Sequence, residues 1–243
     1  MVASQGGARI AYTRATMDLP GSPPSRGVRD SSARSALRDP LLVDRILERH
    51  GARPGLKPLL DVPCGTGQLR GVFERRGLRC VGVSLAAPVR DSAASQLVAD
   101  VERLPFRDDA FDVVVCCRLL HHLHDPGEIG SVVSELTRVA HRLVVASFWD
   151  SASLHALRRR VGFRRSDGPA ARRAVSKRML RALFRENGAE VVGFYHSFRF
   201  VSQQTFVVAQ KRAPIEARLA ATARITRDLL DLPLGRAPGS LGA

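Results

Sequence analysis

The sequence has no apolar run long enough to cross a lipid bilayer. Its longest runs are Val113–Cys117 and Leu143–Trp149, whereas a membrane-spanning helix needs about 20 apolar residues. The first residues also lack the apolar core of a secretory signal peptide. They are rich in Arg and Ser, as in organellar transit peptides, but Asp18 and Asp30 interrupt that pattern. These absences predict a protein that is neither membrane-spanning nor secreted.

Cysteine is scarce, and its spacing excludes two kinds of site. The chain contains Cys64, Cys80, Cys116 and Cys117, all in strand-like or apolar stretches, and no two of them form a CxxC pair. Structural zinc sites and disulfide frameworks both need closer or more regular cysteine pairs. The sequence therefore predicts no metal site, no disulfide framework and a reducing, cytoplasmic location.

Lysine is also rare, so arginine carries most of the positive charge. Three of the 38 basic residues are lysines, and the net charge is +15. Residues 40–150 contain 14 basic and 14 acidic residues, whereas residues 151–243 contain 18 basic and 6 acidic residues. A GC-rich coding sequence explains a preference for arginine, but it acts on both regions alike. The excess in the last third therefore indicates a second cause, such as an anionic partner.

Strand-like and helix-like segments alternate from residue 40 to residue 210. Asp39-Pro40 is typical of a helix start, with Asp39 as N-cap and Pro40 in the first turn. We predict strands over residues 58–62, 79–83, 97–99, 111–117, 141–148, 190–195 and 205–209, and helices that begin near Pro40, Gln68, Pro88, Pro126, Ser176 and Pro214. This alternation predicts an α/β fold with a mostly parallel sheet covered on both faces. The last two strands have no helix between them and should pair antiparallel at one edge.

The segment after the first predicted strand carries the strongest chemical signal. Residues 59–69 read LLDVPCGTGQL. Gly65 and Gly67 predict a tight turn that brings the backbone close to a ligand. The dinucleotide fingerprint needs a third glycine at position 70, but that position is Arg70. Asp61, which precedes the glycines, suits a cationic ligand better than a pyrophosphate. A nucleotide-dependent oxidoreductase is therefore disfavoured.

Asp61–Gly67 resembles the first motif of the class I S-adenosylmethionine-dependent methyltransferases. The similarity continues in the family's order through LVADVERLPF (97–106), FDVVV (111–115), LHHL (120–123) and ELTRV (135–139). It is closest to the small-molecule and lipid branch that includes the ubiquinone-pathway enzymes. The resemblance implies a three-layer Rossmann-like sandwich with a seven-stranded, mostly parallel sheet and one antiparallel edge strand. It also implies S-adenosylmethionine as cofactor and methyl transfer to a small-molecule or lipid acceptor.

The resemblance also assigns a set of residues to the cofactor. These are Asp61, Pro63, Cys64, Gly65, Gly67, Ser84, Leu85, Asp100, Val101 and Cys117. Pro63 departs from the family, which usually has glycine there, and it lacks a backbone N–H. Ser84 stands where the family usually has an acidic residue that binds the ribose; a neutral acceptor there lowers affinity roughly tenfold. For Asp61 and Asp100, the alternative interpretation is a structural cap of the loop.

The catalytic residues are not assigned by the sequence. His121, His122 and His124 lack the spacing of a helical metal pair, so we expect packing roles, with His122 the better candidate for lining the acceptor pocket. Methyl transfer from a sulfonium needs alignment above all, and a general base only when the acceptor is protonated. Three further residues are candidates for the mouth of that pocket: Trp149, Tyr195 and His196.

An Arg-rich segment follows the fifth predicted strand. Residues 158–178 contain nine basic residues and one acidic residue, at a place where family members commonly carry an insertion over the substrate. It is either a solvated, codon-biased loop or a contact for an anion: an acidic metabolite, a phospholipid surface reached by peripheral membrane contact, or RNA. Phe163 is its one aromatic residue, and binders of single strands interleave several. Nucleic acid therefore ranks below an acidic small molecule or lipid.

The expected organisation has three parts. Residues 1–37 are predicted to be a flexible segment, residues 38–212 the methyltransferase domain with its Arg-rich insertion at about 150–178, and residues 213–243 a C-terminal helix and tail. An alternative function also stays open. Because Pro63 and Ser84 depart from the family pattern, the chain could be a degenerate methyltransferase fold that binds a partner without turnover.

Overall fold

The computed structural model describes residues 26–55, 57–84, 96–123, 125–153, 174–196 and 204–212, with side chains from Arg38 onward except at Gln96. The helices predicted to begin at Pro88 and Pro214 lie outside the described residues, as do Leu85, His124 and most of the Arg-rich insertion.

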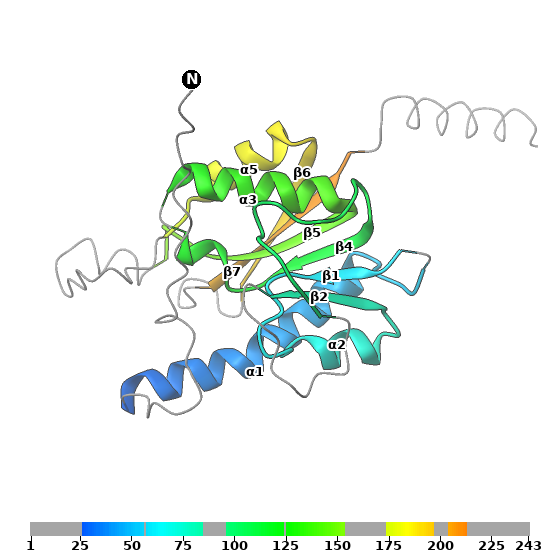
Figure 1. Cartoon of the computed structure of the whole chain (residues 1–243). Coiled ribbons are helices and arrows are strands. Elements are labelled where there is room, and N and C mark those ends of the chain that lie inside the picture. The colour runs from blue at the N-terminus through cyan, green and yellow to red at the C-terminus, as the bar shows by residue number, and fades with distance from the viewer. Residues whose placement is uncertain are drawn as a thin grey trace, which may run out of the picture.

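Seven strands form one sheet, in the order β3-β2-β1-β4-β5-β7-β6 (Figure 1). The strands are β1 (Leu59–Asp61), β2 (Cys80–Ser84), β3 (Gln96–Val98), β4 (Phe111–Cys116), β5 (Ala140–Trp149), β6 (Ala189–His196) and β7 (Gln204–Lys211). The first five are parallel, and β7 runs antiparallel to both β5 and β6. The predicted fold class is therefore confirmed.

The terminal pair of strands lies at one edge of the sheet, with β7 inside and β6 outermost. The residues explain this order. In β7, Thr205 to Ala209 are all buried, as a strand with neighbours on both sides requires. In β6, Glu190 and Val192 are exposed, as suits an edge.

Helices cover both faces of the sheet (Figure 1). They are α1 (Arg26–Arg49), α2 (Arg70–Arg75), α3 (Pro126–Val139) and α5 (Lys177–Glu186), with a short 3₁₀ helix, η1 (Leu120–His122). The apolar stripes of α1 and α2 pack on one face of β1, β4, β5 and β7, and those of α3 and α5 pack on the other. The three-layer arrangement leaves the strand ends as the places where a ligand can reach the backbone.

The capping residues in the sequence correctly predict where α3 and α5 begin. Asp125 caps α3 through a complete capping box with Glu128, and the hydroxyl of Ser176 accepts the N–H of Met179 at the start of α5. Such caps satisfy N–H groups that have no partner within the helix.

The predicted start of the first helix is wrong, because α1 begins at Arg26 and runs through Pro40. Asp39 does not cap this helix. Its carboxylate is buried and accepts hydrogen bonds from the guanidinium of Arg118 at 2.8 Å and from the amide of Gln204 at 3.2 Å. A buried carboxylate needs such partners, so the tertiary contacts decide the role of Asp39.

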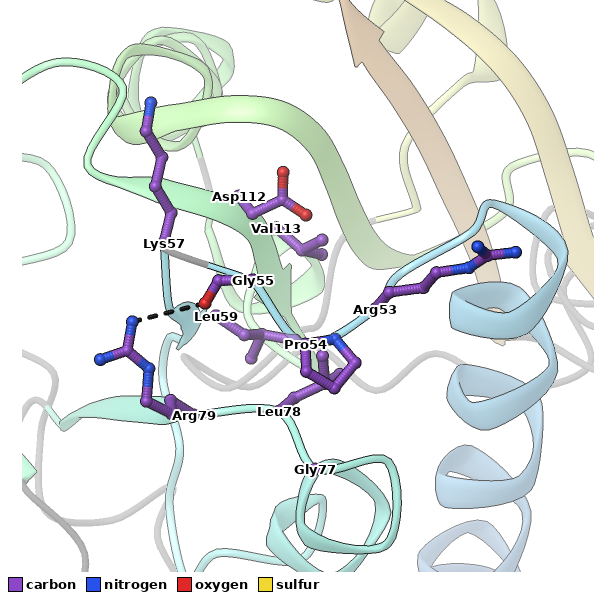
Figure 2. Close-up of a pocket in the computed structure, with 10 residues that line it drawn as sticks. All are labelled: Arg53, Pro54, Gly55, Lys57, Leu59, Gly77, Leu78, Arg79, Asp112 and Val113. Carbon is purple, nitrogen blue, oxygen red and sulfur yellow. Dashed lines mark hydrogen bonds between the residues drawn. The ribbon is translucent and has the colours of Figure 1, made fainter.

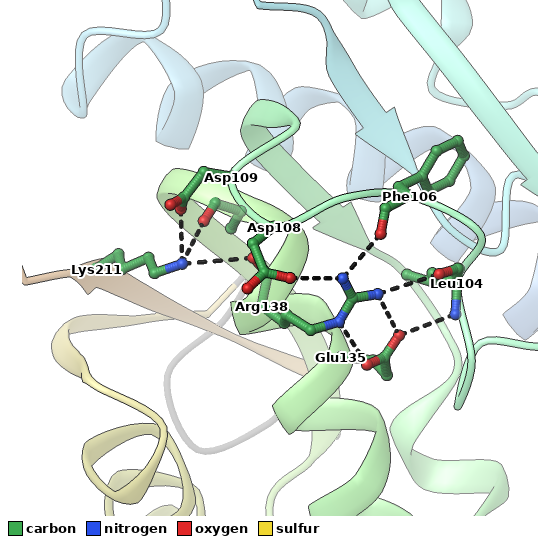
Figure 3. Close-up of polar contacts among 8 residues, drawn as sticks. Leu104, Phe106, Asp108, Asp109, Glu135, Arg138 and Lys211 are labelled. Carbon is green, nitrogen blue, oxygen red and sulfur yellow. Dashed lines mark hydrogen bonds and ion pairs between the residues drawn. The ribbon is translucent and has the colours of Figure 1, made fainter.

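A cluster around Arg138 fixes the loop between β3 and β4 (Figure 3). The guanidinium donates to the carbonyl oxygens of Leu104 and Phe106 and to the carboxylates of Glu135 and Asp108, over 2.7–3.1 Å. Glu135 in turn accepts the N–H of Leu104 at 2.9 Å. The sequence segments LPF and ELTRV are thus physically joined.

Candidate cofactor and acceptor site

The positions predicted to contact the cofactor lie at one edge of the sheet. Asp61 ends β1, Ser84 ends β2, Asp100 follows β3 and Cys117 directly follows β4. Because these strands are parallel, their carboxyl ends meet at the same edge, which is where open α/β sheets bind ligands.

The turn after β1 has the backbone geometry that its glycines predict. Gly65 and Gly67 have φ values of +51° and +76°, which glycine adopts without strain. The N–H of Cys64 donates to the carbonyl of Val83 at 2.8 Å, which ties the turn to β2. A Cβ built on Gly65 would have no atom within 4 Å. The loop backbone therefore borders open space. Pro63 is half-buried in this turn, after a cis peptide bond.

Asp61 is buried at the base of this turn, and its carboxylate is not fully hydrogen-bonded. The residue is 3% exposed, and its Oδ1 atom has no hydrogen-bond partner among the described residues. Burial raises the pKa of this carboxyl to about 8. A buried carboxylate without a partner is costly and marks a functional-site candidate. A donor or cation placed here would stabilise the charged form.

Two other predicted cofactor residues have structural roles. The carboxylate of Asp100 accepts the N–H of Glu102 at 3.0 Å, so it caps its own turn, although it is exposed. Val101 is 3% exposed and packs in the core. Contact of either residue with a cofactor stays a prediction.

The cysteines of this edge are packed thiols. Burial raises the pKa of Cys64 to about 11 and raises that of Cys117 well above its usual range. A nucleophilic cysteine needs a lowered pKa, so neither residue is suited to covalent chemistry.

The histidine segment lies beside the end of β4 in η1. His121 is 4% exposed, and its ring stacks on Trp149 with centroids 4.7 Å apart and an interplanar angle of 2°. His122 is less buried, with its ring centroid 4.3 Å from that of His121. These contacts give His121 a packing role and leave His122 as the candidate for the acceptor side. The described parts of the chain contain no cluster of three or more His, Cys, Asp or Glu residues that could hold a metal ion.

Arg118 directly follows Cys117, and no pattern in the sequence indicates its role. Its φ of +62° is uncommon for a residue with a side chain. Its N–H donates to the hydroxyl of Ser147 at 2.7 Å, and its guanidinium pairs with Asp39 of α1. Arg118 therefore joins α1 to the end of β4 at the same edge as the glycine turn.

A second polar cluster lies where β5 and β6 end. The ammonium of Lys177 pairs with buried Asp150 at 2.9 Å and lies 3.5 Å from Nε2 of His196, whose Nδ1 is 3.0 Å from the hydroxyl of Thr205. Lysine only donates, so Nε2 of His196 is the acceptor in this contact. The cluster places a lysine ammonium and an imidazole beside the proposed acceptor side.

Tyr195 was a candidate for the same edge, but its hydroxyl points elsewhere. It hydrogen-bonds Nε2 of His50, just after α1, at 2.8 Å, and its ring packs over Gly193. The carbonyl of His50 accepts from Arg142, which also pairs with Asp112 at the start of β4. Tyr195 therefore fastens α1 to β6 and does not line the acceptor side.

A pocket of about 170 Å³ opens at the opposite, amino edge of the sheet, beside Leu59 and Val113 (Figure 2). Three basic residues line it, but their side chains diverge: Lys57 and Arg53 point away from each other, and Arg79 donates to the carbonyl of Gly55 at 3.5 Å. The pocket therefore offers no convergent anion site, and it is separate from the glycine turn.

Comparisons with known proteins agree with the geometry. Residues 60–143 match the family described as "Methyltransferase domain". An uncharacterized methyltransferase of Mycobacterium leprae is 33% identical over 116 residues, covering 44% of this chain and 43% of its own length. A ubiquinone biosynthesis O-methyltransferase of Hahella chejuensis is 36% identical over 113 residues, covering 42% and 45%. The chain thus spans less than half the length of these relatives.

Solved structures share the fold. Magnesium protoporphyrin IX methyltransferase from Synechocystis PCC 6803, crystallised with S-adenosylhomocysteine, superposes with a TM-score of 0.60 at 19% identity, covering 79% of this chain and 90% of its own. The 1,6-didemethyltoxoflavin-N1-methyltransferase of Burkholderia thailandensis gives a TM-score of 0.52 at 18% identity, covering 79% and 93%.

Among the residues that the structure describes, no helix is long and apolar enough to cross a membrane. The domain match, the order of the motifs and the sheet topology agree with one another. In these respects the chain is similar to the class I S-adenosylmethionine-dependent methyltransferases, in sequence over residues 60–143 and in fold over most of its length.

Proposed function

We propose that this chain binds S-adenosylmethionine at the turn after β1 and transfers its methyl group to a small-molecule or lipid acceptor. The observation that carries the proposal is the buried Asp61 carboxylate, whose Oδ1 has no partner among the described residues, beneath a glycine turn that borders open space. S-adenosylmethionine carries an ammonium and a sulfonium, and a cation or donor is what this carboxylate needs. When bound, the cofactor supplies an activated methyl group.

The acceptor would lie beyond the ends of β4 and β5. Arg118, His122 and the Lys177 ammonium are among the described polar groups on that side. Lys177 supports an acceptor with an anionic group, because its third N–H is not used by Asp150 or His196. Holding an acceptor atom in line with the methyl group can supply about 7–11 kcal/mol of the barrier. His122 is the candidate base for an acceptor that must lose a proton.

A degenerate fold that binds without turnover is the second candidate, and Pro63 and Ser84 favour it. The first experiment is a calorimetric titration with S-adenosylmethionine and S-adenosylhomocysteine, with NADPH as a control. Micromolar binding of the first two and none of NADPH is the expected result. Turnover with acidic and lipid acceptors then separates the enzyme from the degenerate fold. A folded protein that binds neither S-adenosylmethionine nor S-adenosylhomocysteine would contradict the cofactor assignment.

Substituting one glycine of the turn tests the location of the site. Gly65→Ala is expected to lower S-adenosylmethionine affinity tenfold or more, because the new methyl group enters the space that the turn borders. Its left-handed φ costs the fold about 1–2 kcal/mol. Affinity is measured by calorimetry and stability by urea unfolding.

Gly51→Ala is the matched control for this variant. Gly51 has a φ of +64°, also with nothing within 4 Å of a built Cβ, but it follows α1, away from the turn. It should lose similar stability and keep full affinity. Equal affinities in the two variants would move the cofactor site away from Gly65.

A further inference from the structure

Helix α5 presents one strongly basic face. At 100° per residue, Lys177, Arg178, Arg181 and Arg185 fall within an arc of about 100°. The three arginines are exposed, whereas Leu180 and Phe184 on another side of the helix are buried in the core. We refer to Arg178, Arg181 and Arg185 as the arginine face. Figure 1 shows α5 (yellow) at the outside of the molecule, near the edge strand β6.

The arginine face has no acidic counterpart, unlike the other basic helices. On α2 the carboxylate of Glu74 pairs with Arg70, and the carboxylates of Asp44 and Glu48 on α1 pair with Arg76 just after α2. In α5 the one acidic residue is Glu186, which lies about 80–140° from the three arginines on the helical wheel. Among the described residues, no carboxylate pairs with any of the three arginines. Their charge is therefore available to an external anion.

The aromatic residue beneath this face is covered by cations. Arg181 and Lys177 lie over the ring of Phe194, at 4.8 Å and 5.4 Å from its centroid. The large apolar side chains exposed in the described part of the chain are all aliphatic. The arginine face thus offers no aromatic platform for nucleobases and no amide side chain to read base edges.

We propose that the arginine face binds the anionic headgroups of a phospholipid surface. A row of headgroup phosphates needs neither stacking nor base readout, and guanidinium groups bind phosphate oxygens in pairs. The row from Arg178 to Arg185 runs about 10 Å along a straight helix, so all three arginines can contact one flat surface. The N-terminal end of α5, at Lys177, lies beside the ends of β5 and β6. A surface bound along α5 would therefore adjoin the carboxyl edge of the sheet.

The test uses the full chain and vesicles of equimolar phosphatidylglycerol and phosphatidylcholine, with pure phosphatidylcholine vesicles as reference. The wild type should co-sediment with the anionic vesicles at low salt and dissociate as salt rises. The triple variant Arg178→Gln, Arg181→Gln, Arg185→Gln should bind them roughly 100-fold more weakly, since each arginine near such a surface contributes about 1 kcal/mol and 1.4 kcal/mol is tenfold.

The matched control removes the same charge from another place. Arg45→Gln, Arg49→Gln, Arg53→Gln changes three exposed arginines at and just after the end of α1 and should weaken binding no more than about threefold at physiological salt. A circular-dichroism melt checks that both variants fold. Cofactor titration is run separately, so loss of vesicle binding and loss of the methyltransferase site are distinguishable.

The proposal is overturned if the wild type does not bind anionic vesicles, or if both triple variants lose vesicle binding equally. An RNA duplex is tested in parallel. If the wild type binds the duplex but not the vesicles, and the α5 variant loses duplex binding, the partner is a nucleic acid and the lipid proposal is wrong. Vesicle binding that only the α5 variant loses supports the proposal.

Discussion

Replacing Asp61 with Asn is expected to stabilise the ligand-free protein and, at the same time, to weaken its binding of S-adenosylmethionine. The carboxyl group is buried and its Oδ1 has no partner among the described residues, so the ligand-free fold bears the cost either of a desolvated charge or of protonating it. Asn is nearly isosteric and neutral, and it removes that cost. The substitution also removes the negative charge that would interact with the bound cofactor. A charged hydrogen bond contributes about 1.5–3 kcal/mol, so affinity should fall about 10- to 100-fold.

The stability effect has a defined pH dependence. The pKa of Asp61 rises from its ordinary value of 3.8, which applies to the unfolded chain, to about 8 in the fold. Between these values the native state binds more protons than the unfolded state, so the free energy of unfolding falls as pH rises. Each pH unit in this range lowers the free energy of unfolding by about 1.4 kcal/mol. The stability gain of Asp61→Asn over the wild type should therefore grow by roughly 3–4 kcal/mol from pH 5 to pH 8, measured by urea unfolding.

Cofactor binding should also release a proton from Asp61. A cation beside the carboxylate lowers its pKa, so at pH 7 the protonated group of the ligand-free protein ionises on binding. Calorimetry in buffers of different ionisation enthalpy measures this release, which should approach one proton in the wild type and vanish in Asp61→Asn. If the variant binds S-adenosylmethionine as tightly as the wild type, with the same proton release, Asp61 does not face the cofactor.

The parts of the fold that could be predicted correctly from the sequence depend on short-range patterns. Asp125 with Glu128, and Ser176 before α5, are caps that a few neighbouring residues determine. The order of strands β1 to β5 along the chain likewise follows from apolar segments alternating with helices. The glycine turn could be predicted for the same reason, since a positive φ at Gly65 and Gly67 is a local requirement.

The features that could not be predicted from the sequence depend on contacts between distant residues. Asp39 looked like an N-cap because Pro40 follows it, yet its partners are Arg118 and Gln204, 79 and 165 residues away in the chain. Tyr195 looked available to the acceptor side, but its partner His50 is 145 residues away. The left-handed backbone of Arg118 has no signal in the residue type. The direction of these side chains is set only when the distant segments pack together.

Replacing Arg138 with Met is expected to lower the free energy of unfolding more than replacing any other partly exposed side chain that the structure describes. The guanidinium satisfies two backbone carbonyls and two carboxylates (Figure 3). Met is shorter than Arg, but it replaces the aliphatic stem and so keeps the apolar packing of that part. Breaking a buried pair costs about 3–5 kcal/mol. Arg138 is 31% exposed, so water compensates in part and about 2–3 kcal/mol is expected. The melting temperature should fall by roughly 5–10 °C.

Three comparisons show whether the loss of stability comes from the contacts of Arg138. Arg70→Met breaks an exposed i,i+4 pair with Glu74 and should cost about 0.5 kcal/mol or less. Arg138→Lys keeps the charge but loses the planar fork, so it should recover less than half of the stability. In a double-mutant cycle with Glu135→Leu, the pair should be coupled by about 1–3 kcal/mol. Additive losses would mean that Arg138 acts through Leu104, Phe106 and Asp108 and not through its bond with Glu135.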